Sequence, residues 1–287
     1  MKGIVLAGGK GTRLYPLTQA ISKQLMPIYD KPMIYYPLST LIAMGIHDVL
    51  IISSPEDLPL FERLLGDGSA WGCSFSYAEQ AQPNGLAEAF LIAEDFINNS
   101  PVALILGDNL FYGHQIKPYA LGGENQKGAG IFAYRVKDPQ RYGVVSVDEK
   151  NNVIALHEKP TQPASSFAVP GLYFYDNTVV EKAKKLKPSA RGELEITDIN
   201  QAYLNENSLQ VSFLSSGAVW LDTGTISSLT EASQYVETIQ SRQGILVGSP
   251  ELAALDSGAI SRETAMQLAE KINTSEYGKA LLSILKK

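Results

Sequence analysis

The sequence predicts an α/β fold: a mostly parallel mixed sheet with helices on both faces, an added β-rich part and a helical C-terminus. Three apolar runs have the length and composition of strands buried on both faces. Segments of helical character separate them, and this alternation is typical of a parallel sheet covered on both sides. We expect these strands at residues 2–7, 48–53 and 101–106, and the helices at residues 32–44, 55–65 and 85–98.

Glycine and proline set the boundaries of the first elements. A glycine cluster follows the run 2–7 at once, so this strand is expected to end in a loop. Pro32 suits the first position of the next helix, and Gly45 suits its end. Pro37 is unfavourable inside that helix because it lacks the N–H group that the helix needs.

The middle of the chain changes to short β-rich segments, which predict added strands rather than further strand–helix units. From about residue 226 the pattern is helical, and Ser261 is placed to cap a helix over 262–272 ahead of a last one over 278–285. We expect the middle strands at residues 129–136, 143–147, 153–158, 168–175 and 209–214, and a helix at residues 193–205.

Composition and charge exclude several classes of protein. The 287 residues contain 24 Lys and Arg against 30 Asp and Glu, a net charge of −6 that argues against a general nucleic-acid binder. A small phosphorylated ligand is still compatible with this charge. Cys73 is the only cysteine, which excludes an internal disulfide and a cysteine-rich metal site. Because no apolar run is as long as a membrane span and no signal-peptide pattern is present, we expect a cytoplasmic protein without a membrane partner.

The most distinctive motif is a glycine-rich loop directly after the first strand, Leu6-Ala7-Gly8-Gly9-Lys10-Gly11-Thr12-Arg13-Leu14. Glycines let a loop approach an anion closely, and its exposed N–H groups can cradle phosphates. Arg13 adds a planar cation suited to phosphate oxygens, and Lys23 could add a second positive charge. The loop matches neither a P-loop nor the dinucleotide fingerprint of a nicotinamide-dependent dehydrogenase. The alternative is a tight turn without a ligand, which would not need both cations.

Carboxylates stand at the ends of several predicted strands. Asp108 follows the run 101–106, at the edge where open α/β sheets bind ligands, and is a candidate ligand for Mg²⁺. Asp222 could be a second ligand, but sequence spacing does not support the pairing, and each aspartate could equally be a cap or turn former. Glu158 and Lys159 end another strand and could bind a hydroxyl and a phosphate, or form a surface ion pair.

Together with motifs along the whole chain, these segments closely resemble the sugar nucleotidyltransferase family. The loop LAGGKGTRL is specific to this superfamily, and GDNLFYG, GELEITDIN and WLDTGT resemble its thymidylyltransferase branch. The resemblance implies a Rossmann-like core over 1–225, with a nucleotide-binding part at roughly 1–125 and a sugar-binding part at roughly 126–225. It leaves 226–287 as a helical segment that could serve as an oligomer or regulatory interface.

The resemblance also implies a reaction. A phosphate oxygen of glucose 1-phosphate would attack the α-phosphorus of dTTP in line, giving dTDP-glucose and pyrophosphate, with Mg²⁺ as cofactor. It further implies a homotetramer. Two alternatives stay open: the same chemistry with UTP, since thymine and uracil differ by one methyl group, or a catalytically silent nucleotide-sensing subunit on the same fold.

Roles are implied residue by residue. The catalytic residues would be Arg13 at the leaving pyrophosphate, Lys23 at the α-phosphate and sugar phosphate, Lys159 at the sugar phosphate, and Asp108 and Asp222 on Mg²⁺. The nucleotide would be bound by Leu6, Gly8, Gly9, Gly11, Thr12, Arg13, Gln24, Gln80, Pro83, Gly85, Leu86 and Asp108. The sugar phosphate would be bound by Asn109, Tyr142, Gly143, Glu158, Lys159, Val169, Tyr173 and Trp220.

The sequence departs from the family pattern at three places. Asn84 stands where the family has aspartate, and we expect a retained loop with one charge fewer, because asparagine also forms such turns. The segment 215–219 lacks the arginine that the family carries before Trp220. Pro170 stands where the family often has threonine.

Overall fold

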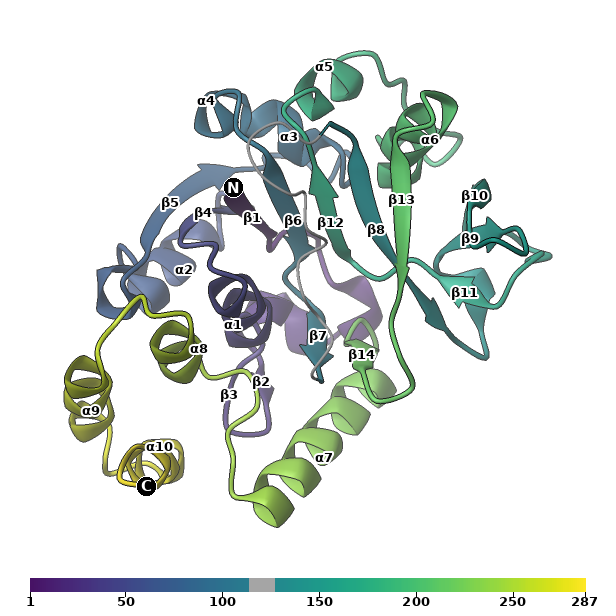
Figure 1. Cartoon of the computed structure of the whole chain (residues 1–287). Helices are drawn as coiled ribbons and strands as arrows, with labels where there is room; N and C mark the ends of the chain where they lie inside the picture. The colour runs from purple at the N-terminus through teal and green to yellow at the C-terminus, as the bar shows by residue number, and fades with distance from the viewer. Residues whose placement is uncertain (114–126) are drawn as a thin grey trace.

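A large mixed sheet forms the centre of the computed structural model, which describes residues 1–113 and 127–287 (Figure 1). Its strand order is β10-β9-β11-β8-β12-β6-β1-β4-β5, and β13 pairs with β8 outside this path. One half of the sheet is parallel and consists of β1 (Lys2–Leu6), β4 (Asp48–Ser53), β5 (Ser74–Glu79) and β6 (Val102–Leu106). The predicted α/β fold is confirmed, although β5 had no clear signal in the sequence.

The parallel half is centred on β1. Val5 lies opposite Ile51 on β4 and opposite Ile105 on β6, and all three side chains are fully buried. Strands that are covered on both faces are apolar at nearly every position, which is why these runs are visible in the sequence. The three strands run in the same direction, so the glycine-rich loop after β1 and Asp108 after β6 meet at one edge of the sheet.

The other half of the sheet holds the added strands. β12 pairs antiparallel with β6 and β8, and β8 continues into a small outer region (Figure 1). The predicted strand over 168–175 is two strands, because Pro170 has no N–H group to give to a ladder. The strands of this half are β8 (Ala129–Arg135), β9 (Gly143–Val147), β10 (Val153–Glu158), β11 (Phe167–Ala168), β12 (Leu172–Tyr175) and β13 (Leu209–Phe213).

Helices cover both faces of the sheet, as predicted. One face packs against α3 (Glu88–Ile92), α4 (Glu94–Ile97), α5 (Val179–Ala183) and α6 (Ile196–Asn205). The other packs against α1 (Tyr35–Ala43), α2 (Leu58–Leu65) and α8 (Pro250–Asp256). Phe90 and Ile199 are fully buried in the first core, and Leu38 and Phe61 in the second. Burial of each such side chain contributes about 1.5–3 kcal/mol to stability.

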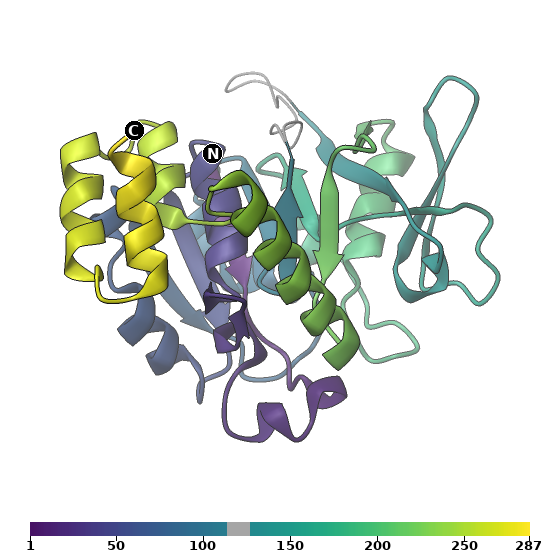
Figure 2. The same ribbon diagram turned by 90° about the horizontal axis from the view of Figure 1, so that it is seen from below.

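The C-terminal segment is helical, as predicted, and its last two helices, drawn in yellow, lie at the opposite end of the molecule from β9 and β10 (Figure 2). α7 (Ile226–Gln243) begins at a capping box formed by Thr225 and Ser228. Ser261 caps α9 (Arg262–Lys271), as predicted. α10 (Glu276–Leu285) begins earlier than predicted because Ser275 caps it.

The helix predicted over 32–44 begins later, at Tyr35. Pro32, its first residue, instead belongs to β3 (Lys31–Pro32), which pairs with β2 (Pro27–Ile28). Pro37 therefore falls in the first turn of α1, where an N–H group has no partner within the helix and its absence costs little.

The helix predicted over 85–98 is two short helices, α3 and α4, and neither includes residues 85–87. Hydrogen bonds to a distant segment keep residues 85–87 out of the helix. The Ala87 amide donates to Leu194 O at 3.1 Å, and the Leu194 amide donates to Asn84 O at 2.6 Å. Gly85 has a φ of +113, and a Cβ at this residue would lie 2.4 Å from Leu194 O. The glycine is required by this close approach of two chain segments.

A two-stranded ribbon that the sequence did not predict joins two distant segments. β7 (Asn109–Tyr112) pairs antiparallel with β14 (Val219–Asp222), and Asp222 lies opposite Asn109. The ribbon therefore brings the two candidate metal ligands together. The predicted boundary at 125/126 falls outside the described residues. None of the helices in the described ranges is long and apolar enough to cross a membrane.

Candidate active site

The glycine-rich loop turns sharply at the end of β1. Gly9 and Gly11 have φ values of +98 and +57, which favour glycine, and Gly11 precedes a short 3₁₀ turn over Thr12–Leu14. Arg13 extends from this turn toward β14. A Cβ at Gly224 would lie 2.7 Å from Arg13 Nη2 and 3.1 Å from Asp222 Oδ1, so this glycine leaves room for the guanidinium beside the carboxylate.

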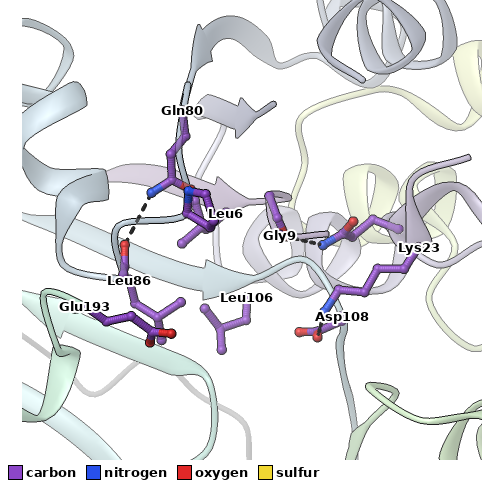
Figure 3. A pocket seen from close by; sticks show the side chains of 12 residues that line it. Leu6, Gly9, Lys23, Gln80, Leu86, Leu106, Asp108 and Glu193 are labelled. Atoms are coloured by element: carbon purple, nitrogen blue, oxygen red, sulfur yellow. Dashed lines mark hydrogen bonds and ion pairs between the residues drawn. The ribbon is translucent and has the colours of Figure 1, made fainter. Parts of the chain in front are cut away.

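A cavity of about 190 Å³ opens beside the loop (Figure 3). Gln80 and Leu86 lie at one end of it, and Lys23 and Asp108 lie at the other. One end is suited to a flat ring and the other to charged groups. Leu6, Gly8, Gly9, Lys23, Gln24, Gln80, Pro83, Gly85, Leu86, Leu106, Asp108 and Glu193 line the cavity.

Most of the residues predicted to bind a nucleotide are therefore brought together. Gly11, Thr12 and Arg13 lie on the loop but do not line this cavity. A second hollow of about 620 Å³ shares Gly9, Lys23 and other residues with the first and extends over residues 15–22, which the sequence did not single out.

Asp108 is held on both carboxylate oxygens. The Lys23 ammonium donates to Oδ2, and Asn109 Nδ2 donates to Oδ1 at 2.9 Å. Burial raises the pKa of Asp108, but the Lys23 charge and these hydrogen bonds outweigh burial and keep the pKa below its usual value. Asp108 is therefore an ionised carboxylate at neutral pH.

The charged form of the neighbouring Asp222 carboxylate is less favourable than that of Asp108. Burial raises the pKa of Asp222, and the Asp108 charge raises it further, against the opposing charges of Lys23 and Arg13. Arg141 Nη2 also lies 3.8 Å from Asp222 Oδ2. Two neighbouring buried carboxylates repel each other, and a cation between them relieves the repulsion.

This donor set fits Mg²⁺. Within residues 1–113 and 127–287, no group of three or more His, Cys, Asp or Glu side chains could hold a metal ion. Mg²⁺, however, is commonly bound by one or two carboxylates together with substrate phosphates and waters. Asp108 lines the charged end of the cavity; Asp222 does not line it, but lies near enough to Asp108 for the two charges to interact, so the pair could offer hard oxygen ligands of this kind.

The β9–β10 hairpin positions the residues predicted to bind the sugar. Its register places Gly143 opposite Glu158, and Thr197 Oγ1 donates to Glu158 Oε2 at 2.6 Å. The Val169 amide donates to Gly143 O at 2.8 Å. Lys159 has a φ of +42, and its ammonium lies 3.4 Å from Glu158 Oε1. A hydroxyl-binding carboxylate and a half-exposed cation therefore stand side by side.

Other residues predicted to bind the sugar belong to a buried hydrogen-bond network. Asn109 Oδ1 accepts hydrogen bonds from Trp220 Nε1 at 2.6 Å and from the Gly171 amide at 3.1 Å. The Tyr142 ring packs on Trp220 with ring centroids 5.0 Å apart. Tyr173 is 4% exposed, and burial raises the pKa of its hydroxyl, which is therefore neutral. Of the predicted sugar residues, Asn109, Trp220 and Tyr173 are thus largely covered by protein.

Sequence reasoning missed several charged residues around the site. Glu193 lines the cavity, and Arg191 Nη2 lies 2.7 Å from Glu195 Oε2 and 3.4 Å from Glu158 Oε1. The helix predicted over 193–205 includes Glu193 and Glu195 and follows Arg191, but α6 begins only at Ile196. The dense run of charges in Arg191-Gly192-Glu193-Leu194-Glu195 was the available signal.

Comparisons with known proteins show the family of the chain. Residues 2–239 match the family described as nucleotidyl transferase. The chain is 54% identical to a glucose-1-phosphate thymidylyltransferase of Mycolicibacterium smegmatis over 285 residues, 99% of each chain. It is 53% identical to one of Neisseria meningitidis over 288 residues, 100% of each chain.

Solved structures of similar proteins share the fold. A Bacillus anthracis protein described as a glucose-1-phosphate thymidylyltransferase, crystallised with sucrose, superposes with a TM-score of 0.76. It is 43% identical, and the match covers 82% of this chain and 94% of that one. A UDP-glucose pyrophosphorylase complexed with UDP-glucose is 26% identical, with a TM-score of 0.73 over 83% of this chain and 98% of that one.

Proposed function

Because the chain belongs to the nucleotidyl transferase family, we propose that it is an enzyme that joins dTTP and glucose 1-phosphate to give dTDP-glucose and pyrophosphate. Full-length relatives with more than half of their residues identical carry this activity in their names. The observation that carries the proposal is a single cavity with Gln80 and Leu86 at one end and the Lys23–Asp108 pair at the other. A base fits the first end and a triphosphate the second.

The bond that forms joins a phosphate oxygen of glucose 1-phosphate to the α-phosphorus of dTTP. The bond that breaks joins that phosphorus to the oxygen leading to the β-phosphorus, so pyrophosphate leaves with the bonding electrons. No protein atom needs to become covalently attached. The protein positions two highly charged reactants and offsets their repulsion, and this can supply most of the rate enhancement.

Each group has a distinct place in this reaction. The backbone of the loop from Gly8 to Thr12 would bind the triphosphate, and Arg13 would stabilise the leaving pyrophosphate. Lys23 would contact the α-phosphate, since its ammonium already lies at the charged end of the cavity. Glu158 would accept hydrogen bonds from glucose hydroxyls, and Lys159 would bind the sugar phosphate.

Asp108 and Asp222 would hold Mg²⁺, which when bound offsets the negative charge of the phosphates. The raised pKa of Asp222 supports this role. Burial and the charge of Asp108 disfavour the ionised form of Asp222, and a bound cation stabilises that form. Lys23 keeps Asp108 ionised and ready to bind the cation.

UTP is the main alternative donor. The fold shared with a UDP-glucose pyrophosphorylase favours it, but at 26% identity this argument is weaker than the 54% identity to a thymidylyltransferase. One methyl group in an apolar pocket discriminates by about 1–3 kcal/mol, so measurable use of UTP is expected. A silent subunit is disfavoured because Arg13, Lys23, Asp108, Lys159 and Asp222 are all retained. We also propose a homotetramer, which a light-scattering mass measurement tests.

The test is pyrophosphate release by the purified protein with Mg²⁺ and glucose 1-phosphate. dTTP, UTP, CTP, ATP and GTP are supplied separately, each with a control that lacks the sugar phosphate. Sugar-dependent release that is strongest with dTTP supports the proposal. Stronger release with another nucleotide keeps the reaction but changes the donor, and no release with any of them refutes the proposed activity.

A further inference from the structure

A carboxylate outside the cavity fixes the orientation of the Gln80 amide. Glu88 is the first residue of α3 and does not line the cavity. Gln80 is 7% exposed and directs its amide nitrogen toward the loop over residues 83–87 (Figure 3). Gln80 Nε2 donates to Glu88 Oε2 at 2.7 Å and to Gly85 O at 3.3 Å.

These two partners occupy the amide nitrogen of Gln80, so only its carbonyl oxygen is available to a ligand. A primary amide has two N–H donors and one carbonyl acceptor, and an ionised carboxylate can only accept. Both N–H groups of Gln80 are engaged by acceptors of the protein, Glu88 Oε2 and Gly85 O. Oε1 lies beside Gly8, another residue of the cavity lining, 3.0 Å from the point where a Cβ at Gly8 would stand. No residue in the described part of the chain donates a hydrogen bond to this oxygen.

The carboxylate of Glu88 is itself held in place. Asn84 Nδ2 donates to Glu88 Oε1 at 2.8 Å, so the two oxygens bridge two amides. Asn84 is exposed and can turn over in water, whereas Gln80 is buried. Glu88 fixes the orientation of both amides. Only Gln80 lines the cavity, so only its orientation determines whether a ligand finds a donor or an acceptor there.

We propose that Glu88 is a positioning residue that sets the hydrogen-bonding polarity of the base pocket. Through Gln80 it presents an acceptor, which selects a base with an N–H group at the edge that is read. Thymine and uracil carry such a donor at N3, whereas cytosine carries an acceptor at N3 and its donor at the neighbouring C4 amino group, so the selection requires that Oε1 reads position N3. The proposal rests on the proposed function in one respect, that the ligand of this cavity is a nucleotide whose base lies near Gln80.

A merely structural role for Glu88 must be separated from this one. A negative charge in the first turn of a helix stabilises the helix, and this effect alone could explain the residue. Glu94 offers a matched control because it is the first residue of α4 and forms an exposed ion pair with Lys184 at 2.5 Å. Loss of either glutamate weakens a helix start, but only loss of Glu88 frees Gln80.

The experiment compares dUTP with dCTP, which differ only at the C4 and N3 edge of the base. Binding is measured by calorimetry with Mg²⁺ and without sugar phosphate, for the wild-type protein and for Glu88→Met, Glu88→Gln and Glu94→Met. Methionine keeps the length of the side chain but removes the acceptor. We expect the wild-type protein to prefer dUTP, and Glu88→Met to lower that preference about tenfold, the scale of one mismatched buried hydrogen bond.

Glu88→Gln should restore most of the preference. Its new carbonyl oxygen can accept from Gln80, and the exposed Asn84 can turn to accept from its new N–H group. Glu94→Met should leave the ratio unchanged. Equal binding of dUTP and dCTP by the wild-type protein, or the same ratio in Glu88→Met as in Glu94→Met, overturns the inference.

Turnover with dTTP is measured in the same preparations. If the wild-type protein prefers dUTP in binding but releases no pyrophosphate with any nucleotide, the proposed function fails while the role of Glu88 stands. If it turns over dTTP and the binding ratio does not respond to Glu88→Met, the role of Glu88 fails while the function stands. If Glu88→Met does not fold, the dUTP-to-dCTP binding ratio is compared between the wild-type protein and Glu88→Ala, and an unchanged ratio overturns the inference.

Discussion

Thr223 donates two hydrogen bonds to the backbone carbonyl oxygen of Asp108, one from its amide at 3.1 Å and one from its hydroxyl at 2.7 Å. Thr223 is fully buried and follows Asp222 directly. The double contact fastens the end of β14 to the start of β7, so the two carboxylates that would share Mg²⁺ are held by backbone geometry. The contact therefore fixes the separation of the two backbone positions that carry these carboxylates.

Thr223→Val should loosen this contact. The change preserves the shape of the side chain but removes the hydroxyl donor, at a cost of about 1 kcal/mol in the free energy of unfolding. The Mg²⁺ concentration that gives half-maximal activity should rise severalfold, because the two carboxylates are no longer held at a fixed separation. A Mg²⁺ titration of pyrophosphate release measures this. Thr223→Ser keeps the hydroxyl and should stay near the wild type; equal Mg²⁺ requirements for Val and Ser would contradict the argument.

Asp222→Asn should raise the stability of the protein and lower its activity. Without Mg²⁺ the variant should melt at a higher temperature than the wild type, because it removes a buried carboxylate that burial and Asp108 disfavour. Its turnover should fall by about two orders of magnitude, the scale of losing one group that stabilises developing charge. Mg²⁺ should raise the melting temperature of the wild type in the presence of dTTP and have little effect on the variant.

Differential scanning calorimetry with and without Mg²⁺ measures these shifts. Asp95→Asn is the matched control, since Asp95 is an exposed carboxylate on α4. A lower melting temperature for Asp222→Asn than for this control, with turnover retained, would rule out the metal-binding role.

The sequence predicted the parts of the fold that depend on local pattern. The strands over 48–53, 143–147 and 153–158 match the predicted bounds because apolar runs and turn residues define them. The β7–β14 ribbon could not be predicted, because each strand has only four residues and its partner is far away in the chain. The pairing of Asp108 with Asp222 depends on that ribbon, so local spacing gave no support for it and only the family resemblance implied it.

The roles of residues that act through a neighbour were equally invisible. Gln80 and Gly85 were expected at the base, but Glu88 was read only as part of a helix over 85–98. Its contact with Gln80 exists because Leu194 keeps residues 85–87 out of that helix. Such contacts between separate loops follow from tertiary structure, not from the periodicity of a single segment.

Partly buried tyrosines should make the protein sensitive to high pH. Burial, with a contribution from Glu251, raises the pKa of Tyr35 to about 12, and burial with Glu62 raises the pKa of Tyr77 to about 12. A phenol has an ordinary pKa of about 10 in an unfolded chain. Between these values the folded state keeps protons that the unfolded state has lost, so stability that is complete below pH 10 declines as the pH rises toward 12.

Tyr35→Phe should reduce that decline. Each such tyrosine contributes a slope of up to about 1.4 kcal/mol per pH unit to the free energy of unfolding in this window. The variant keeps the ring that packs edge-on against Trp71. Urea unfolding at pH 8, 10.5 and 11, followed by circular dichroism, gives the slopes. Identical slopes for the variant and the wild type would show that Tyr35 ionises normally in the folded protein.

Lys159→Ala should affect one substrate and not the other. The Lys159 backbone is fixed by its positive φ and by the hydrogen bond from its amide to Tyr142 O at 3.1 Å, so its ammonium is presented at the end of β10 beside Glu158. Loss of a hydrogen bond to a charged group costs about 1.5–3 kcal/mol, so the KM for glucose 1-phosphate should rise at least about tenfold. The KM for dTTP should change little, because Lys159 does not line the cavity that Gln80 and the glycine-rich loop border. Lys150→Ala is the control, since it removes an exposed lysine from the β9–β10 turn without touching the site. Steady-state kinetics with each substrate varied in turn distinguish the two effects, and a rise in the KM for dTTP alone would assign Lys159 to the nucleotide instead of the sugar phosphate.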